Sequence, residues 1–505
     1  MMLRPIRPKP LIPSRVAISR ALEARVGEQG APGRTLQTSH CSEGALLRSN
    51  EPTYTARIAP PLQMYLLYQL AIVVYAVLAA PRLLVAMVRH GKYRGTLAER
   101  WGRLPAKIDP GTSTSIWLHG VSVGEVMAAR ALVPVLRDRY PGHPLYLSTT
   151  TETGRQVAEG VEGLDGVFYF PFDLSGTVQR VLDQVRPMLV VTVDTELWPN
   201  LLRHCRIRGI RTVLVNGRIS DRSYPRYRLV RWFFRHVLQA LDLACMQSEA
   251  SARRLIAIGA LADRVEVTGN LKFDALEPPT GLLRFGADGM QRTFRLLEGR
   301  AVVVAASTHP GEEPYALDAF EQVAARDPSA VLVLAPRHPE RADEVMTLVV
   351  GRGHPAVRRT ELPFDRELRA RVIVLDTVGE LASLYELATV VFLGGSLVPH
   401  GGHNVLEPAV RARPVVFGPH MHNFAEIADL FLASRAALQI TEPTALGPTL
   451  LRLLEDPVER ASLGAAAQAL VTSHRGATDR CLTLIEGLIP PTRSADPAVV
   501  MRFPT

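Results

Sequence analysis

Acidic side chains follow two of the apolar segments that predict strands in this sequence. Glu125 comes shortly after the segment that ends at His119. A carboxylate at the mouth of a cleft can accept the proton of an attacking hydroxyl group, so Glu125 is a candidate general base. Ser122 and Glu125 also have the spacing of a capping box, in which both side chains only satisfy a helix start. The spacing leaves both interpretations open.

Glu196 and Lys272 are candidates to act beside that base. Glu196 lies in the run Asp194–Asn200, DTELWPN, and could orient a catalytic group or the substrate. Complementarity with a helix dipole is the simpler explanation. Lys272 lies in the turn Gly269–Asp274, GNLKFD, where a cation could stabilise a leaving phosphate or a substrate carboxylate. A solvated surface lysine is the alternative.

The segment from Gly394 to Leu406, GGSLVPHGGHNVL, predicts a binding site for a phosphorylated sugar. Its glycines would allow a ligand to approach the backbone, and a helix opened by Asn404 would offer free N–H groups to phosphate. Glu407 could then hold sugar hydroxyls. A glycine-rich turn with Asn404 and Glu407 as capping partners explains the same residues equally well.

Further polar residues follow other predicted strands. Ser307, Thr308 and His309 precede a glycine and two acids, and Arg337 in the run Pro336–Pro339 could make a forked contact with phosphate or a base edge. Asp376–Leu381, DTVGEL, could contact a nucleotide. The histidines near the glycine-rich segment lie on loops without helical pairing, so we expect no metal site. They are His400, His403, His420 and His422.

Alternating strands and helices must position these residues. Short apolar runs alternate with helical patterns such as Glu125–Arg139 and Val178–Val185, which predicts parallel sheets covered on both faces. The first predicted sheet contains Ile116–His119, Leu145–Ser148, Val167–Phe170, Leu189–Val193, Thr212–Val215, Leu243–Met246 and Val265–Thr268. The second contains Val302–Ala305, Val331–Leu334, Val372–Leu375, Val390–Leu393 and Pro414–Phe417. The fold class is therefore α/β, with two doubly wound Rossmann-like domains facing a cleft, and ligands bind beyond the strand ends.

The net charge and the cysteine content limit the cellular compartments and the classes of partner that suit this protein. The net charge of +9 suits anionic lipid, phosphorylated substrates or nucleic acid. The segment Asp221–His236 interleaves arginines with aromatic residues, which fits lipid headgroups, nucleic acid or an ordinary helix with a buried aromatic face. The four cysteines form no CxxC pair, which favours a reducing compartment.

An apolar run near the N-terminus predicts a membrane anchor. No charged residue lies between Arg57 and Arg82, and roughly 20 apolar residues span a bilayer. We therefore predict an anchor at residues 64–90, spanning or lying in the interface, with a buried core helix as the alternative. Basic residues after this run place the larger part on the cytoplasmic side of the membrane. The proximity of the anchor favours anionic lipid over nucleic acid as a partner.

The motifs taken together resemble the bacterial Kdo transferases, glycosyltransferases of the GT-B type that act on lipid A precursors. The resemblance covers about Met64 to Leu488. The motifs are SVGE at Ser122–Glu125, TELWPN at Thr195–Asn200, N-x-R-x-S at Asn216–Ser220, GNLKFD at Gly269–Asp274, ASTH-x-GEE at Ala306–Glu313, APRHPER at Ala335–Arg341, GGSLV…GGHN-x-LEPA at Gly394–Ala409 and the run Gly418–Phe424.

The resemblance implies transfer of Kdo from CMP-Kdo to a lipid A precursor, lipid IVA, with inversion and without a metal or other cofactor. It implies that Glu125 accepts the proton and that Glu196 and Lys272 stabilise the transition state. The implied CMP contacts are Pro336, Arg337, Val378, Gly379, Glu380, Asn404, Val405, Leu406 and Glu407. Candidate further contacts with donor or acceptor are Ser122, Gly124, Arg218, Ser307, Thr308 and His309.

The resemblance also suggests the location and the domain limits. We expect the protein at the cytoplasmic face of a bacterial inner membrane, in contact with anionic lipids and not with nucleic acid. The expected parts are a disordered or mis-assigned leader at 1–63, an anchor at 64–90, an acceptor domain at 91–277, a linker at 278–300, a CMP-sugar domain at 301–490 and a tail at 491–505. The alternatives are a GT-B enzyme using a UDP-sugar, a nucleotide-sugar epimerase, or a non-catalytic, membrane-tethered nucleotide-sugar binding protein.

Overall fold

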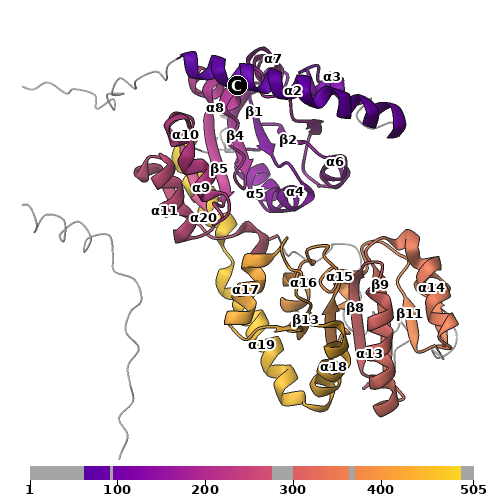
Figure 1. The fold of residues 1–505 in the computed structure, drawn as a ribbon. Helices are drawn as coiled ribbons and strands as arrows, with labels where there is room; N and C mark the ends of the chain where they lie inside the picture. The colour runs from indigo at the N-terminus through magenta and orange to yellow at the C-terminus, as the bar shows by residue number, and fades with distance from the viewer. Residues whose placement is uncertain (1–61, 91–94, 276–298, 363–369, 491–505) are drawn as a thin grey trace, which may run out of the picture. The chain divides into compact units, whose positions relative to one another are not determined.

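The computed structural model describes residues 62–90, 95–275, 299–362 and 370–490 (Figure 1). The predicted leader up to residue 61, the tail at 491–505 and most of the predicted linker lie outside these residues.

The N-terminal half is built on a parallel sheet of seven strands in the order β3-β2-β1-β4-β5-β6-β7. Neighbouring side chains of β1 enter different cores: Ile116 and Leu118 pack on one face of the sheet, and Trp117 packs on the other. A sheet covered on both faces requires such continuous apolar strands. The strands are β1 (Ser115–His119), β2 (Leu145–Thr149), β3 (Gly166–Tyr169), β4 (Pro187–Val193), β5 (Arg211–Gly217), β6 (Leu243–Met246) and β7 (Val265–Val267).

Helices connect these strands, as the alternating pattern predicted. They are α3 (Leu97–Arg100), α4 (Val123–Arg130), α5 (Leu132–Arg139), α6 (Glu152–Glu159), α7 (Ser175–Val185), α8 (Pro199–Ile207), α9 (Tyr224–Leu229), α10 (Arg231–Leu238), α11 (Glu249–Ile258), and the 3₁₀ turns η1 (Ala262–Arg264) and η2 (Leu271–Phe273). The single helix predicted over 125–139 is divided at Ala131. Pro134 explains the break, because it has no N–H to donate to the carbonyl of Arg130.

The C-terminal half repeats this plan, in the order β10-β11-β9-β8-β12-β13-β14. Alternate residues of β8 again enter two cores, Val304 on one face and Val303 on the other. The strands are β8 (Val302–Thr308), β9 (Val331–Pro336), β10 (Ala356–Arg358), β11 (Val372–Val374), β12 (Val390–Leu393), β13 (Val415–Phe417) and β14 (Leu438–Gln439). The prediction of two doubly wound halves is thus confirmed, and the short edge strands β10 and β14 were not predicted.

The helices of the C-terminal half flank this sheet (Figure 1). They are α13 (Glu313–Arg326), α14 (Ala342–Gly351), α15 (Leu381–Leu384), α16 (Leu406–Ala409), α17 (Ala425–Ala433), α18 (Leu446–Glu455) and α19 (Pro457–His474), with the 3₁₀ turns η4 (Pro339–Arg341), η5 (Arg359–Glu361) and η6 (Pro443–Ala445).

The last helix, α20 (Ala477–Leu488), returns to the N-terminal half. Its residues Cys481, Leu482 and Ile485 are buried in the same core as Ile116 and Leu118. The predicted domain at 301–490 placed this helix with the C-terminal sheet. The structure corrects that placement, because the apolar face of α20 completes the N-terminal core.

The apolar run near the N-terminus forms α2 (Leu62–His90), which is attached to the N-terminal half. Tyr65 is buried, and the rings of Tyr65 and Tyr68 lie 6.4 and 5.7 Å from that of Phe233 in α10. Among the residues that the structure describes, no helix is long and apolar enough to cross a membrane. The spanning helix expected from this run is therefore not confirmed; Pro81 and Arg82 interrupt its apolar residues.

Candidate active site

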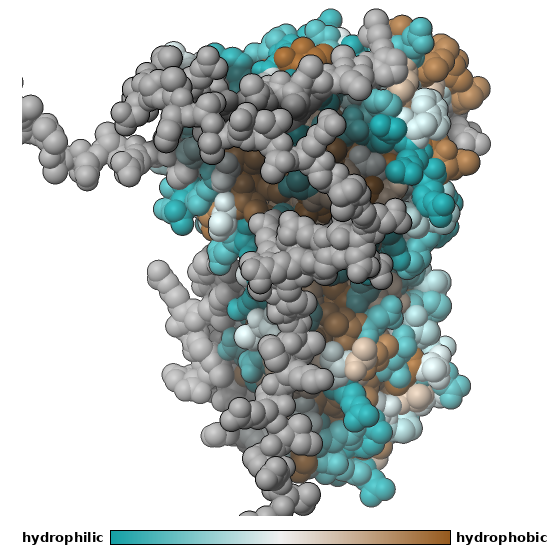
Figure 2. All heavy atoms as spheres, turned by 90° about the vertical axis from the view of Figure 1, so that its left-hand side faces the viewer, coloured by the Kyte–Doolittle hydropathy of each residue, from teal (hydrophilic) through white to brown (hydrophobic). Residues whose placement is uncertain are grey.

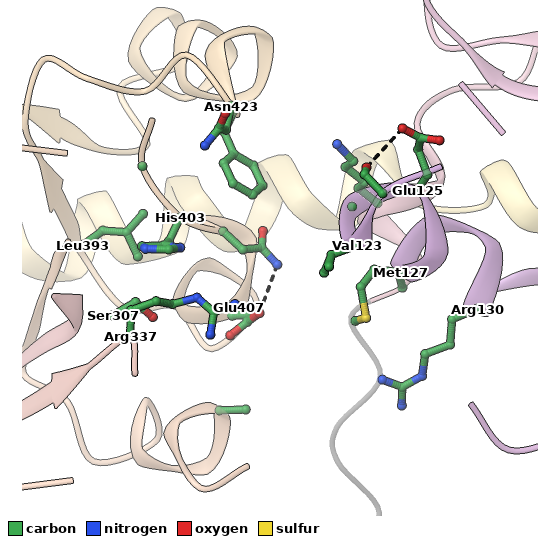
Figure 3. Close-up of a pocket in the computed structure, with 18 of the residues that line it drawn as sticks. Val123, Glu125, Met127, Arg130, Ser307, Arg337, Leu393, His403, Glu407 and Asn423 are labelled. Atoms are coloured by element: carbon green, nitrogen blue, oxygen red, sulfur yellow. Dashed lines mark hydrogen bonds between the residues drawn. The ribbon is translucent and has the colours of Figure 1, made fainter. Parts of the chain in front are cut away.

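Residues of both halves line a cavity of about 820 Å³ (Figure 3). The carboxyl ends of parallel strands supply its polar residues, as expected for open α/β sheets. One wall belongs to the N-terminal half and includes Glu125 and Lys272. The other belongs to the C-terminal half and includes Arg337, Asn404 and Glu407. The cavity therefore brings together residues that the sequence placed on separate strand ends.

Glu125 lies in the first turn of α4. Its Oε2 accepts a hydrogen bond from the backbone N–H of Val121 at 2.6 Å, and its Oε1 accepts one from the Ser122 hydroxyl at 3.1 Å. Burial raises the pKa of Glu125, and the nearby Asp194 raises it further, while these hydrogen bonds and Lys272 lower it. Ser122 makes no side-chain bond to the backbone N–H groups of α4, so the capping box is not formed. Glu125 lines the cavity, as expected for a functional residue.

Two more acids lie beside Glu125. Burial, followed by repulsion from Glu125 and Asp194, raises the pKa of Glu196 to about 8. Burial also raises the pKa of Asp194, with Lys272 opposing the shift. Closely spaced carboxyl groups cannot all ionise easily in a buried site. At neutral pH, Glu196 is therefore mainly a neutral hydrogen-bond donor.

A hydrogen-bond network holds Asp194 and the turn of Lys272. The Asn216 amide donates to Oδ1 of Asp194 at 2.6 Å, and its oxygen accepts the N–H of Leu271 at 2.9 Å. Gln247 donates to the carbonyl of Asn216 at 2.8 Å. Asp194 and Asn216 both have positive φ, 60° and 56°. Non-glycine residues held in this region cluster at functional sites, because their strain must be compensated by surrounding contacts.

Lys272 completes this wall of the cavity. It lies in η2, and its Nζ is 5.7 Å from the centre of the Phe424 ring, which belongs to the C-terminal half. Arg218, directly after β5, forms a 2.7 Å ion pair with Glu426 in α17. Lys272 is therefore a partly exposed cation at the cavity, whereas the guanidinium of Arg218 is paired with an acid.

The opposite wall carries the predicted nucleotide contacts. The amide of Asn404 donates to Oε1 of Glu407 at 3.1 Å, and its oxygen accepts the N–H of Leu406 at 3.2 Å. Burial raises the pKa of Glu407, and Asn404, Arg411 and Arg337 lower it. Arg337 is exposed in the cavity. The helix that follows, α16, is only four residues long, so side chains rather than a long helix dipole dominate this wall.

Three N–H groups at the start of the glycine-rich loop are occupied by a buried glutamate. Glu312 accepts hydrogen bonds from the backbone of Gly395, Ser396 and Leu397 at 2.6, 3.0 and 2.9 Å, and from His309 at 2.9 Å. A Cβ atom at Gly394 would lie 2.6 Å from the carbonyl oxygen of Ser307. This first double glycine therefore allows close packing against the end of β8, rather than the approach of a ligand to the backbone that the sequence suggested.

Comparison with known proteins shows which family contains this chain. The family described as 3-deoxy-D-manno-octulosonic-acid transferase (kdotransferase) matches residues 95–275. The 3-deoxy-D-manno-octulosonic acid transferase of Haemophilus influenzae is 35% identical over 404 residues, which cover 79% of this chain and 92% of that protein. The chain belongs to the Kdo transferase family. The Bordetella pertussis transferase is 34% identical over 396 residues, which cover 77% of this chain and 90% of that protein.

A solved structure supports the architecture of this Kdo transferase. The UDP-GlcNAc 2-epimerase from Neisseria meningitidis bound to UDP-GlcNAc has a TM-score of 0.52 and 13% identity, covering 74% of this chain and all of that chain. An identity this low supports a shared fold alone. With the two parallel sheets, it confirms a GT-B-like arrangement. The family membership, rather than this shared fold, identifies the chain as a glycosyltransferase.

Most predicted site residues of the transferase line the cavity. They are Ser122, Gly124, Glu125, Arg218, Lys272, Ser307, Arg337, Gly379, Asn404 and Glu407. Several others lie outside the lining, including Glu196 and His309. Thr308, Pro336, Val405 and Leu406 are buried in the fold, and Val378 is 87% exposed. Glu380 is bonded to Arg359 and Thr377, which gives it a role in local structure.

The sequence analysis did not identify three residues of α4 that line the cavity. Val123, Met127 and Arg130 of α4 face the wall that carries Glu407 (Figure 3). Their spacing of one and two helical turns could have revealed them once Glu125 was placed at the helix start. His403 and Arg411 were also missed as lining residues. Among the described residues, no group of three or more metal-ligating side chains could hold a metal ion.

Proposed function

We propose that this transferase moves Kdo from CMP-Kdo to a lipid A precursor, lipid IVA, by an inverting, metal-independent displacement. The observation that carries the proposal is the cavity in which Glu125 and Lys272 face Arg337, Asn404 and Glu407. A base and a cation on one wall suit acceptor activation, and the other wall suits a nucleotide. The established membership in the Kdo transferase family names the sugar that is transferred.

The proposed reaction is a single displacement. The acceptor hydroxyl attacks the anomeric carbon of Kdo, the bond from that carbon to the phosphate oxygen of CMP breaks, and CMP leaves with the bonding electrons. Glu125 takes the hydroxyl proton. Lys272 stabilises negative charge on the departing CMP, and neutral Glu196 donates a hydrogen bond close to the base. Arg337 and Glu407 hold the nucleotide.

We further propose that α2 places the enzyme at the cytoplasmic face of the inner membrane. Several apolar side chains of α2 are exposed, including Leu67 at 60% and Leu78 at 73%. Hydrophobic residues gather at the top of the molecule in Figure 2, the end at which α2 lies in Figure 1. Trp232 of α10 is also 57% exposed, and arginines flank it. An apolar face with flanking arginines suits an anionic membrane surface.

Incubation with CMP-Kdo and lipid IVA, followed by mass analysis of the lipid, tests the activity. We expect a product heavier by one or more Kdo units, with EDTA present or absent. Parallel reactions with UDP-sugars test the alternative donor. Turnover of a UDP-sugar but not of CMP-Kdo would contradict the proposal, and binding of CMP-Kdo without any transfer would favour a binding protein.

Vesicle sedimentation tests the location. Substitution of Leu67, Leu70 and Leu78 by Ser should reduce binding to anionic vesicles, while the same changes leave the cavity intact. Binding of wild-type protein should weaken with added salt, because salt screens the arginines. Equal sedimentation of the wild-type and triple-Ser proteins would exclude α2 as the membrane contact.

A further inference from the structure

Four histidine rings form a cluster on the C-terminal wall of the cavity. His309 is central: its Nε2 lies 3.0 Å from Nε2 of His403, and its ring stacks on that of His400 with centres 4.1 Å apart. The ring of His338 approaches His309 edge-on at 6.2 Å. These residues, which we term the imidazole cluster, come from the loops after β8, β9 and β12. Three loops thus converge to gather imidazoles at one place.

The imidazole cluster lies in a positive environment. Burial is the first cause that lowers the pKa of both His309 and His403 to about 4, and the neighbouring histidines and Arg337 lower both values further. Arg341 acts on His309 in the same direction, although it is itself paired with Glu313 and Glu344. Glu312, which accepts the backbone N–H of His309, is engaged by four backbone N–H groups. His309 and His403 are therefore neutral, one Nε2–H donating to the other Nε2, in a field that favours an anion.

The cluster opens directly into the cavity. His403 lines the cavity beside Arg337 and Ser307, immediately before Asn404 in the chain (Figure 3). Gly395 makes this position possible, because a Cβ atom there would lie 3.0 Å from Nε2 of His403 and 3.3 Å from His309. His338 and His400 are exposed at the outer side of the cluster. The glycine thus makes room for an imidazole at the cavity wall.

We propose that the imidazole cluster is the subsite for the carboxylate of the transferred sugar. This inference rests on the proposed function, in which the donor carries two anionic groups, a phosphate and a sugar carboxylate. Arg337 and Asn404 serve the nucleotide side of the wall, and Glu312 takes the amides of Gly395, Ser396 and Leu397. His403, supported by His309, is then the donor group at the wall that remains for the second anion.

Anion binding at this subsite must be coupled to protons. A carboxylate beside His403 stabilises the protonated ring, so the bound form holds a proton more tightly than the free form. Because the pKa of His403 in the free protein is about 4, the affinity for an anionic sugar donor rises as the pH falls toward that value.

Steady-state kinetics with His403→Gln and His309→Gln test the subsite. Gln keeps a neutral donor for the neighbouring ring but cannot be protonated. We expect KM for CMP-Kdo to rise at least ~10-fold, as for loss of one charge-assisted hydrogen bond, while the inhibition constant of CMP changes less than about twofold. His354→Gln is the matched control, since His354 pairs with Glu321 away from the cavity. The wild-type pH dependence of KM should be absent in His403→Gln.

Comparing KM for CMP-Kdo with the inhibition constant of CMP distinguishes binding of the sugar carboxylate from binding of the phosphate. If the variants bind CMP and CMP-Kdo with equally reduced affinity, the cluster binds the phosphate and the inference is wrong. If neither affinity is reduced, the cluster has only a structural role and the inference is equally wrong. His400 is exposed, so His400→Gln provides a second variant if unfolding curves show that His309→Gln is destabilised. Lack of CMP-Kdo turnover by the wild-type protein would refute the proposed function itself. Turnover with unchanged KM in the variants would refute the subsite alone.

Discussion

Glu196 should tolerate replacement by glutamine at neutral pH, whereas Glu125 should not. The pKa of Glu196 is raised to about 8 by burial and by the adjacent carboxylates. At pH 7 only about one-tenth of the molecules then carry an ionised Glu196. Glutamine resembles the neutral acid in shape and also donates a hydrogen bond. We therefore expect kcat/KM of Glu196→Gln to stay within about threefold of wild type at pH 7, as for a group already neutral.

Glu125→Gln should behave differently, because a glutamine cannot accept the hydroxyl proton. Gln at this position still accepts the Val121 N–H bond, so folding should be retained. We expect kcat to fall by at least ~10²-fold with donor affinity nearly unchanged. Glu249→Gln, at an exposed position of α11, controls for the change of charge. The assay is mass-resolved Kdo transfer under saturating acceptor.

The pH profile provides the refuting result. The activity of wild type should fall as the pH rises through about 8, where Glu196 ionises and its hydrogen-bond donor is lost. The Glu196→Gln protein should lack this limb. If Glu196→Gln loses as much activity at pH 7 as Glu125→Gln, Glu196 acts as an ionised carboxylate. The reasoning from burial would then be wrong.

Three further substitutions test the nucleotide wall, the strand-end network and the attachment of α2. Glu407→Ala should weaken CMP binding by about 1.5–3 kcal/mol in calorimetry, and unchanged affinity would exclude Glu407 as a contact. Asn216→Ala should lower kcat more than donor KM, since Asp194 and the Lys272 turn lose a shared anchor; a changed melting temperature with unchanged kcat would indicate a structural role only. Tyr68→Phe removes the hydroxyl that donates to buried Asp173 and should lower the free energy of unfolding by about 1–3 kcal/mol, whereas Tyr75→Phe should not.

The fold was predictable because a central strand that is buried on both faces of its sheet has a continuous run of apolar residues. Trp117 and Leu118 enter opposite cores, so β1 reads as an uninterrupted apolar run. The edge strands have no such apolar run: β10 has three residues of intermediate burial, and β14 has only two residues. The return of α20 was also missed, because the spacing of apolar residues along a helix does not show which core its apolar face joins.

The site was predictable only as far as strand ends indicate it. Glu125 and Lys272 follow strands directly, and parallel topology brings such positions to one edge. The role of Glu312 was not predictable, since its partners in the loop after β12 are 83 to 85 residues away in the sequence. Likewise, His309 meets His403 across 94 residues. Pairings of this range depend on how two loops pack, which local spacing does not encode.

The return of α20 has a consequence for the catalytic turn. Asp274, two residues after Lys272, accepts the N–H groups of Gly476 and Thr478 at 2.8 and 2.6 Å, where α20 begins. The preceding helix, α19, is packed in the C-terminal core through Ala467 and Val471. The turn that presents Lys272 is therefore bonded to the segment through which the chain leaves the C-terminal half. Any displacement of α19 relative to the N-terminal core acts on this segment first, and through Asp274 it acts on the position of the cation.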